Sequence, residues 1–231
     1  MKKILLFMLI SSYSLFADAL PTSIKSTVKS ISNNIITLNS NIPVGMSGII
    51  MHDYGNGLSA ITHTTISLGG SKASVQAHTA ILHKNIPSIQ TAITAGDNVI
   101  FGNFYNNALI IAPNQTAYKQ ISKKFKRTWI HPDAFALDFM QEGESRISMN
   151  VLERFSKKNQ IGLVLVIATD KLLIIDPISK KIIGTRELKT NPSTAITPFY
   201  ARFDQIDLSV FSVGENSKHY TPYFQSVAGL K

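Results

Sequence analysis

Between residue 24 and about residue 105, hydrophobic and polar positions follow the two-residue period that is typical of β-strands. The residues from Ile24 to Ser30 keep this alternation over several steps. Turn residues separate the apolar runs, at Asn33-Asn34, Asn56-Gly57 and Gly69-Gly70. Asn-Gly is a strong hairpin signal because both residues tolerate a positive φ. The pattern predicts a meander of about six strands.

A sheet of short strands leaves unpaired edges unless it closes on itself or pairs with a neighbour. We therefore expect residues 24–106 to form a small β-barrel without a helix longer than about two turns. Its last strand should run from Asn98 to Tyr105, after a turn at Gly96-Asp97.

Beyond residue 107 the pattern changes to strands that alternate with helices. Ala108–Ala112 is typical of a buried strand, and Asn114 is a plausible N-cap for a helix from Gln115 to Phe125. After a short strand at Trp129-Ile130, His131-Pro132-Asp133 opens a second helix, because proline fits the first helical turn. We interpret Asp133 as a helix-start residue and Asp138 as a surface residue.

The remaining pattern predicts a third helix, a central strand and a hairpin. The helix, from Ile147 to Asn159, places its apolar residues on one face. Gln160–Ala168 shows no alternation, which indicates a strand buried on both faces. The hairpin pairs Leu172–Ile175 with Lys181–Leu188 around Asp176-Pro177. Further strands are expected at Phe199–Phe203 and Leu208–Val213, and the fewest contacts in the last fifteen residues.

These elements predict an α+β fold with a small β-barrel lobe followed by a mixed α/β lobe. The barrel lobe covers residues 24–106 and the mixed lobe residues 107–215, so the lobes meet near residues 105–108. Residues 216–231 form a C-terminal tail.

The first residues have the pattern of a secretory signal peptide, with Lys2 and Lys3 ahead of the apolar run Ile4–Ile10. Cleavage after Ala17 or after Ala19 fits the small-residue rule, and we assign residues 1–17 to the leader. The protein is then exported, to the periplasm or to the outer membrane and cell surface. No later stretch is long and apolar enough for a transmembrane helix.

Composition restricts the chemistry of the chain further. It contains no cysteine, which excludes disulfides, thiolate metal sites and a lipidated cysteine. Cleavage after Ala17 removes Lys2 and Lys3 and leaves 21 basic against 14 acidic residues, a formal charge of +7. The cations are scattered and not interleaved with aromatic residues, so anionic lipid, polysaccharide or an acidic protein is a better partner than nucleic acid.

The sequence shows no known catalytic motif, and we expect a binding protein with no enzymatic activity, cofactor or metal. Glu142 and Glu144 flank Gly143 and are interpreted as solvated charges. Four of the six histidines, His52, His63, His78 and His83, fall in the barrel lobe, where exposed or hydrogen-bonded strand positions are favoured over a shared metal. His131 is interpreted as a helix-entry residue.

Lys123, Lys124 and Lys126 form a basic cluster at the end of the first predicted helix. Cations at a helix C-terminus complement the negative end of the helix dipole. We therefore interpret the cluster first as structural and second as a binding patch.

Four segments together resemble one known family: Gly45–His52, Gly96–Ile100, Ala108–Asn114 and Trp129–Asp133. In order and spacing they are similar to the plasminogen-binding protein N-terminal domain family, exported proteins of epsilon-class Gram-negative bacteria. The resemblance extends from about Ile24 to Leu188.

The resemblance implies binding of a protein partner, either host plasminogen or a component of the bacterial envelope. The kringle modules of plasminogen are similar to domains with a pocket for a lysine that has a free α-carboxylate. The last residue of this sequence is Lys231, which would fit such a pocket. Lys231 is therefore the first candidate ligand-binding residue, with Lys123, Lys124 and Lys126 as the alternative. The arrangement also looks like that of periplasmic modules around flagellar basal bodies, which leaves a structural role in an outer-membrane or flagellar-associated assembly as the alternative function.

Overall fold

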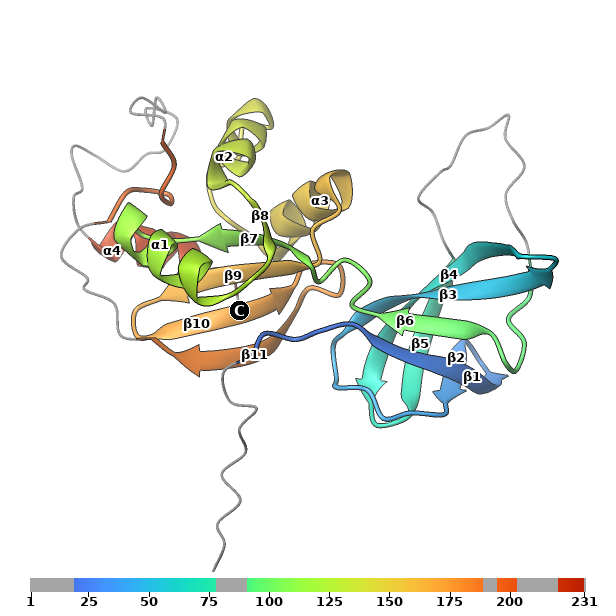
Figure 1. Ribbon diagram of the computed structural model, residues 1–231. Coiled ribbons are helices and arrows are strands. Elements are labelled where there is room, and N and C mark those ends of the chain that lie inside the picture. Colours follow the sequence, from blue (N-terminus) through green and yellow to red (C-terminus); the bar gives the residue numbers. More distant parts are fainter. Residues whose placement is uncertain (1–18, 78–90, 189–194, 203–219, 231) are drawn as a thin grey trace, which may run out of the picture.

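The computed structural model describes residues 19–77, 91–188, 195–202 and 220–230, which form a β-barrel followed by a mixed α/β lobe (Figure 1). The predicted α+β class and the order of the two architectures are therefore confirmed. The last barrel strand ends at Phe101, and the first strand of the second sheet begins at Asn107.

The barrel is closed and antiparallel, and its strands lie in the order β1-β2-β5-β4-β3-β6, with β6 pairing back onto β1. The prediction of a simple meander was wrong, because β2 pairs with β5 and β6 lies between β3 and β1. In this order every strand pairs with two neighbours, so the barrel leaves no open edge. The six strands are β1 (Ile24–Ser32), β2 (Ile35–Leu38), β3 (Ser47–Gly55), β4 (Leu58–Gly69), β5 (Lys72–Ala77) and β6 (Asn98–Phe101).

The strand predicted to run from Asn98 to Tyr105 ends four residues earlier than expected. Gly102 has a φ of +63°, a conformation that favours glycine and breaks the strand. An added Cβ at this position would also lie 2.6 Å from the Tyr105 ring. The chain therefore turns tightly, and Tyr105 packs inward, 2% exposed, instead of continuing the barrel.

The α/β lobe contains a five-stranded sheet in the order β11-β10-β9-β7-β8. β7 runs parallel to β8 and β9, whereas β10 is antiparallel to β9 and β11. The predicted central strand is confirmed, because β9 lies in the middle of the sheet and its first five residues are buried. The strands are β7 (Asn107–Ile111), β8 (Thr128–Ile130), β9 (Leu163–Ala168), β10 (Lys171–Asp176) and β11 (Lys181–Glu187).

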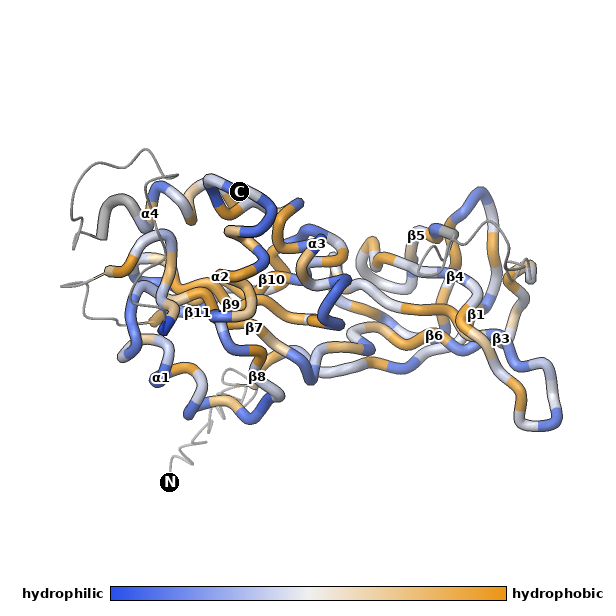
Figure 2. Tube along the Cα trace, turned by 90° about the horizontal axis from the view of Figure 1, so that it is seen from above, coloured by the Kyte–Doolittle hydropathy of each residue, from blue (hydrophilic) through white to orange (hydrophobic). Residues whose placement is uncertain are grey.

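Helices cover the two faces of this sheet unequally. On one face α1 (Gln115–Lys124) packs against side chains such as Ile110 and Leu165. The other face is covered by α2 (Pro132–Gln141), α3 (Met149–Asn159) and α4 (Tyr220–Ala228). In Figure 2 the hydrophobic segments gather at β7, β9 and β10, between these layers. The first face is therefore covered by helix only in part.

Each of the three predicted helices has a side-chain N-cap. Asn114 Oδ1 accepts a 2.9 Å hydrogen bond from the Ala117 N–H, as predicted. His131 caps α2 through a 3.2 Å bond from the Asp133 N–H to its Nδ1, which confirms its interpretation as a helix-entry residue. The third helix begins at Met149 instead of Ile147, because Ser148 caps it.

The C-terminal region differs from the prediction. Residues 216–231 were expected to form a tail, but they contain α4, which packs onto the sheet, with Tyr223 fully buried and Leu230 only 1% exposed. The Tyr223 hydroxyl donates to the Ile167 carbonyl at 2.6 Å. The predicted strand from Phe199 is also wrong over residues 199–202, which are irregular, although the Tyr200 N–H donates to the Ala112 carbonyl. Phe203 and Leu208–Val213 lie outside the described residues.

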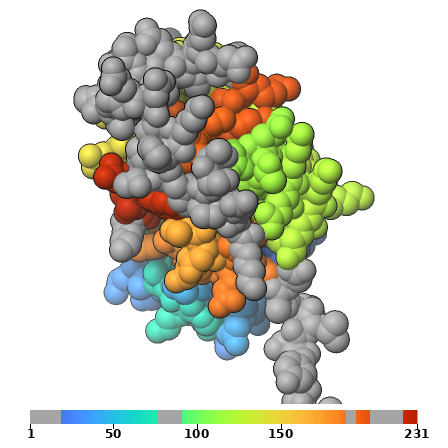
Figure 3. All heavy atoms as spheres, turned by 90° about the vertical axis from the view of Figure 1, so that its left-hand side faces the viewer, coloured from blue at the N-terminus to red at the C-terminus, as the bar shows by residue number. Residues whose placement is uncertain are grey.

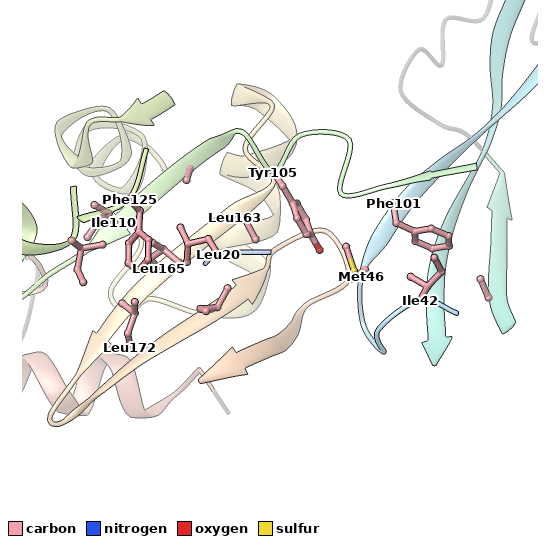
Figure 4. Close-up of a cluster of buried hydrophobic side chains, with 14 of the residues drawn as sticks. Leu20, Ile42, Met46, Phe101, Tyr105, Ile110, Phe125, Leu163, Leu165 and Leu172 are labelled. Carbon is pink, nitrogen blue, oxygen red and sulfur yellow. The ribbon is translucent and has the colours of Figure 1, made fainter. Parts of the chain in front are cut away.

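One hydrophobic cluster runs through both lobes and joins them (Figure 4). It extends from Ile42, Met46 and Phe101 of the barrel through Tyr105 to Leu163 in the sheet. The polar centre of this junction is the fully buried Asp176 carboxylate, whose Oδ2 accepts 2.7 Å hydrogen bonds from the N–H and hydroxyl of Ser47 and from the Tyr105 hydroxyl. From the sequence, Asp176 was predicted only as a turn residue.

Candidate binding surface

Helix α1 is held in place by its apolar side and presents its polar side outward. Ala117 and Ile121 are buried in the first hydrophobic cluster, and Phe125 joins them one turn later. The Trp129 indole N–H donates to the Ser122 carbonyl at 3.2 Å, which ties β8 to the helix. The opposite side of the helix therefore faces solvent in a fixed orientation.

The predicted basic cluster lies on this outward side. Lys123, Lys124 and Lys126 are all exposed, and Lys124 lies 5.5 Å above the Phe125 ring centroid. Lys119, which the sequence analysis missed, is also exposed and precedes Lys123 by one helical turn. We call these four residues the α1 lysine surface; Figure 3 shows α1, in light green, protruding from the molecule.

The α1 lysine surface is electrostatically different from the opposite helical layer. No Asp or Glu occurs between Asp97 and Asp133, a segment that contains these four lysines and Arg127. In the described part of the chain, Lys119, Lys123 and Lys126 form no ion pair. The charges of these three lysines are thus not neutralised by any of the described carboxylates.

On α2 and α3, by contrast, cations are paired with carboxylates of the same lobe. Lys158 Nζ lies 2.9 Å from Asp138 Oδ1, so Asp138 is a buried ion-pair residue instead of the predicted surface residue. Glu144 is bound by Arg154 at 2.6 Å, and this hydrogen bond raises the pKa of Arg154. Burial would raise the pKa of Glu153, but hydrogen bonds from lysines hold it below the usual value. The charged side chains of α2 and α3 are thus neutralised by partners in the same lobe.

The first candidate residue, Lys231, lies outside the described residues. The preceding residue, Leu230, is buried against the sheet. The two sets of candidate lysines are therefore on different elements: the α1 lysine surface belongs to α1 and its C-terminal connection, whereas Lys231 follows α4.

A polar and aromatic cluster lies where the parallel strands β7 and β8 end. Asp133 is buried, not merely a helix-start residue, and accepts bonds from the Arg202 N–H at 2.8 Å and from its guanidinium at 2.6 Å. The rings of Tyr118, His131 and Tyr200 pack beside it, with centroids 5.4 to 6.4 Å apart. This cluster fastens residues 199–202 over the carboxyl edge of the sheet.

The pKa values in this cluster respond to burial and to charge. Burial lowers the pKa of His131, and the nearby Arg202 lowers it further, while Asp133 acts in the opposite direction. Burial would raise the pKa of Asp133, but hydrogen bonds from Arg202 and the proximity of His131 hold it below its usual value. The ring contacts and the ion pair between Asp133 and Arg202 explain this cluster as a structural feature that holds residues 199–202 in place.

The barrel histidines provide no metal set among the residues that the structure covers. His52 Nδ1 lies 2.8 Å from Asp97 Oδ1, and Asp97 also accepts bonds from the Thr94 N–H and hydroxyl. His78 and His83 lie outside the described ranges. Within those ranges no three His, Cys, Asp or Glu side chains are placed to share a metal ion. Nor is any described helix long and apolar enough to cross a membrane.

Comparison with known proteins gives the family. The family model described as plasminogen-binding protein PgbA N-terminal matches residues 23–228, almost the whole described chain. The chain belongs to this family. Similar curated proteins are the plasminogen-binding protein PgbA of Helicobacter pylori strains 26695 and J99, each 26% identical over 193 residues. No solved structure matches.

The match confirms the resemblance inferred from the four sequence segments. It covers 80% of this chain but 42% of each relative. The chain therefore spans less than half the length of these curated relatives, and their name describes the longer proteins.

Proposed function

We propose that the protein is an exported binding protein of the bacterial envelope that captures plasminogen through exposed lysine side chains. The observation that carries the proposal is the α1 lysine surface, a set of exposed lysines in a segment without carboxylates. The names of the two curated relatives support plasminogen as the partner. The partner is thus a protein with lysine-binding sites.

Two sets of lysines fit this role in different ways. A lysine that carries a free α-carboxylate as well as its ammonium suits a pocket built for both groups, and such a pocket leaves one group unpaired when it meets an internal lysine. The α1 lysine surface offers several internal lysines and a diffuse positive field, whose attraction decreases with salt. Lys231 is the first candidate from the sequence, and the α1 lysine surface is the candidate that the described residues support.

Surface plasmon resonance with immobilised plasminogen tests the proposal. The comparison includes the parent protein, a Lys231 deletion and a Lys123→Ala/Lys124→Ala/Lys126→Ala variant, each at two salt concentrations. A matched control, Lys25→Ala/Lys29→Ala/Lys72→Ala, removes the same charge from exposed positions on the barrel. Loss of about tenfold or more on deletion of Lys231, and competition by an amino-carboxylate lysine analogue, would support Lys231.

The other outcomes are equally informative. If only the α1 variant loses affinity, with a strong salt dependence, the α1 lysine surface is the contact. If both triple variants lose affinity equally, binding reflects net charge alone and the proposed surfaces are wrong. If the parent does not bind, plasminogen is not its partner, and a structural role in a periplasmic assembly becomes the better hypothesis.

Export and exposure require a separate experiment. Protease treatment of intact cells should remove a surface-exposed protein, whereas a periplasmic protein should be cleaved only after the outer membrane is ruptured. The intact mass of the envelope form should show a start at Asp18 or Leu20. A form that begins at Met1 and resists signal peptidase would contradict export.

A further inference from the structure

A groove of about 400 Å³ lies at the junction of the two lobes, on the sheet face that α1 covers only in part. One wall is the extended N-terminal segment from Ala19 to Ile24, and the other is β11. Ile174 of β10 and the barrel residues Pro43 and Met46 complete it. The groove exists because an extended segment, and not a second helix, lies on this part of the sheet face.

The N-terminal wall is fixed by specific contacts. Leu20 is buried, 4% exposed, in the cluster that joins the lobes. The Arg127 guanidinium donates to the Pro21 carbonyl at 3.1 Å, and Arg186 donates to the Ala19 carbonyl. Ser23 Oγ donates to the Gly102 carbonyl at 2.6 Å. The groove is thus a built feature that both lobes hold open.

The floor of the groove suits a hydrocarbon chain. Gly184 has no side chain to fill it, and an added Cβ would lie 3.3 Å from Ile174 Cδ1. Pro21 and Pro43 in the walls have no N–H with which to pair a polar backbone. A peptide lying here would bury unpaired carbonyl groups, whereas a hydrocarbon would bury none. The walls therefore favour an apolar chain over a peptide.

Regular strand addition to β11 is also disfavoured. The register between β10 and β11 shifts between Ile174 and Ile175, so β11 carries an irregularity next to Gly184. Such bulges disturb the spacing of outward backbone groups and protect edge strands from pairing. An extended partner would therefore not find a regular ladder along this edge.

One cation, Arg186, lines the groove but donates to the Ala19 carbonyl, and a second cation, Lys181, lies beside the barrel end of the groove. Lys181 is exposed at the start of β11, and its Cβ would lie 3.0 Å from a Cβ built on Gly45, between the lining residues Pro43 and Met46. The lining residue Ile183 lies on the same side, since its Cγ2 would be 3.2 Å from that built Cβ. No acidic side chain lines the groove. An anionic group at this end would be attracted by Lys181.

We propose that this groove binds a single-chain amphiphile with an anionic head group. The apolar chain lies over Ile174 and Ile183, and the anionic head pairs with Lys181. This site is independent of the lysine-dependent capture of plasminogen, because none of the α1 lysines or Lys231 takes part. It adds a small-molecule ligand to a protein whose family is named for a protein partner.

Titration calorimetry with three probes of equal chain length tests the proposal: decanoate, decanol and decyltrimethylammonium, all below the concentrations at which they form micelles. Decanoate should bind with one site per chain. Its affinity should exceed that of the cationic probe by about tenfold or more, since charge-assisted pairs contribute this order of energy. Equal binding of the three probes, or no binding of decanoate, would overturn the proposal.

Two neighbouring lysines provide a matched pair of variants. Lys181→Gln should weaken decanoate binding about threefold, as expected for an exposed ion pair, and leave decanol binding unchanged. Lys180→Gln removes the same charge one residue earlier, where Lys180 Nζ pairs with Glu153 on α3 at 2.8 Å, and should leave decanoate binding unchanged. Equal losses in the two variants would show a non-specific charge effect and refute the site.

A third variant tests the position of the chain. Gly184→Leu should place a side chain in the groove and reduce the affinity for both decanoate and decanol by a similar factor. Its thermal unfolding should be measured alongside, because Ile174 must move slightly to accept the new side chain. A folded Gly184→Leu protein that binds decanoate like the parent would exclude the groove as the site, whatever the result with plasminogen.

Discussion

The hydroxyl of Tyr105 donates a 2.7 Å hydrogen bond to Asp176 Oδ2, although 71 residues separate them. Tyr105 follows the last barrel strand, and Asp176 ends β10 of the second sheet. The same oxygen accepts two bonds from Ser47 at the start of β3, and Oδ1 accepts the N–H groups of Ile178 and Ser179. One buried carboxylate thus satisfies donors from both lobes.

We expect Asp176→Asn to destabilise the protein by about 2–4 kcal/mol, because its amide places N–H groups where donors already converge and leaves buried partners unpaired. Chemical denaturation followed by circular dichroism measures the effect. Asp170→Asn, in the exposed turn after β9, is the matched control and should change stability by less than about 0.5 kcal/mol. Equal effects would contradict the role assigned to Asp176.

Alkaline pH should destabilise the protein through the same junction between the two lobes. Burial and, next, the Asp176 carboxylate raise the pKa of Tyr105 far above its usual value of 10.0. Below pH 10 the phenol is protonated in both states; above it the unfolded chain loses this proton while the folded chain retains it. Stability should therefore fall as the pH rises above 10. Tyr105→Phe should be less stable near neutral pH but show a weaker alkaline loss, measured by denaturation at several pH values.

A parent and a Tyr105→Phe protein with the same alkaline slope would show that Tyr105 does not control this transition. Absorbance of tyrosinate provides an independent readout, because the Tyr105 phenol of the parent should ionise only on unfolding. Tyr105→Phe should lose that delayed step.

The elements that carry a local period were predictable from the sequence. The unbroken apolar run at Leu163–Ala168 identified the central strand, and Asn114 identified the start of α1 through a contact three residues away. The closed barrel followed from the need to cover strand edges, but its order did not, because the β2–β5 pairing depends on contacts with no local signature.

The parts that escaped prediction are those fixed by distant contacts. Nothing near Asp176 indicates that Ser47, 129 residues earlier, will donate to it. Asp133 resembled an ordinary helix-start residue because its partner, Arg202, lies 69 residues later, in a segment that was predicted to be a strand. Lys119 could have been found, since it stands four residues before Lys123 on the same helix.

The N-terminal segment should contribute measurably to the stability of the junction between the lobes. Leu20→Ala should destabilise the protein by about 2–4 kcal/mol, because a buried leucine leaves both lost transfer energy and a cavity. Thr22→Ala, at an exposed position two residues later, is the control and should be nearly neutral. Thermal unfolding with two probes, one for each lobe, is the measurement. If Leu20→Ala matched Thr22→Ala, the segment would not stabilise the junction.

The last prediction concerns the charges around His131, whose pKa can be moved in both directions. Arg202 lowers the pKa of His131 and Asp133 raises it, so removing each should have opposite effects. Arg202→Gln should raise the His131 pKa and also raise that of Asp133, which loses hydrogen bonds from Arg202. Asp133→Asn should lower the His131 pKa. Nuclear magnetic resonance titration of the imidazole measures both shifts.

The sign of the stability change follows from these directions. His131 and Asp133 both have pKa values below their usual ones, so the folded state binds fewer protons than the unfolded state in these two ranges. Stability should therefore fall as the pH decreases through about 6.5 and again near 4. Arg202→Gln should weaken both slopes, whereas Arg146→Gln, at an exposed position before α3, should leave them unchanged. If Arg202→Gln and Asp133→Asn moved the His131 pKa in the same direction, the charge balance inferred for this cluster would be wrong.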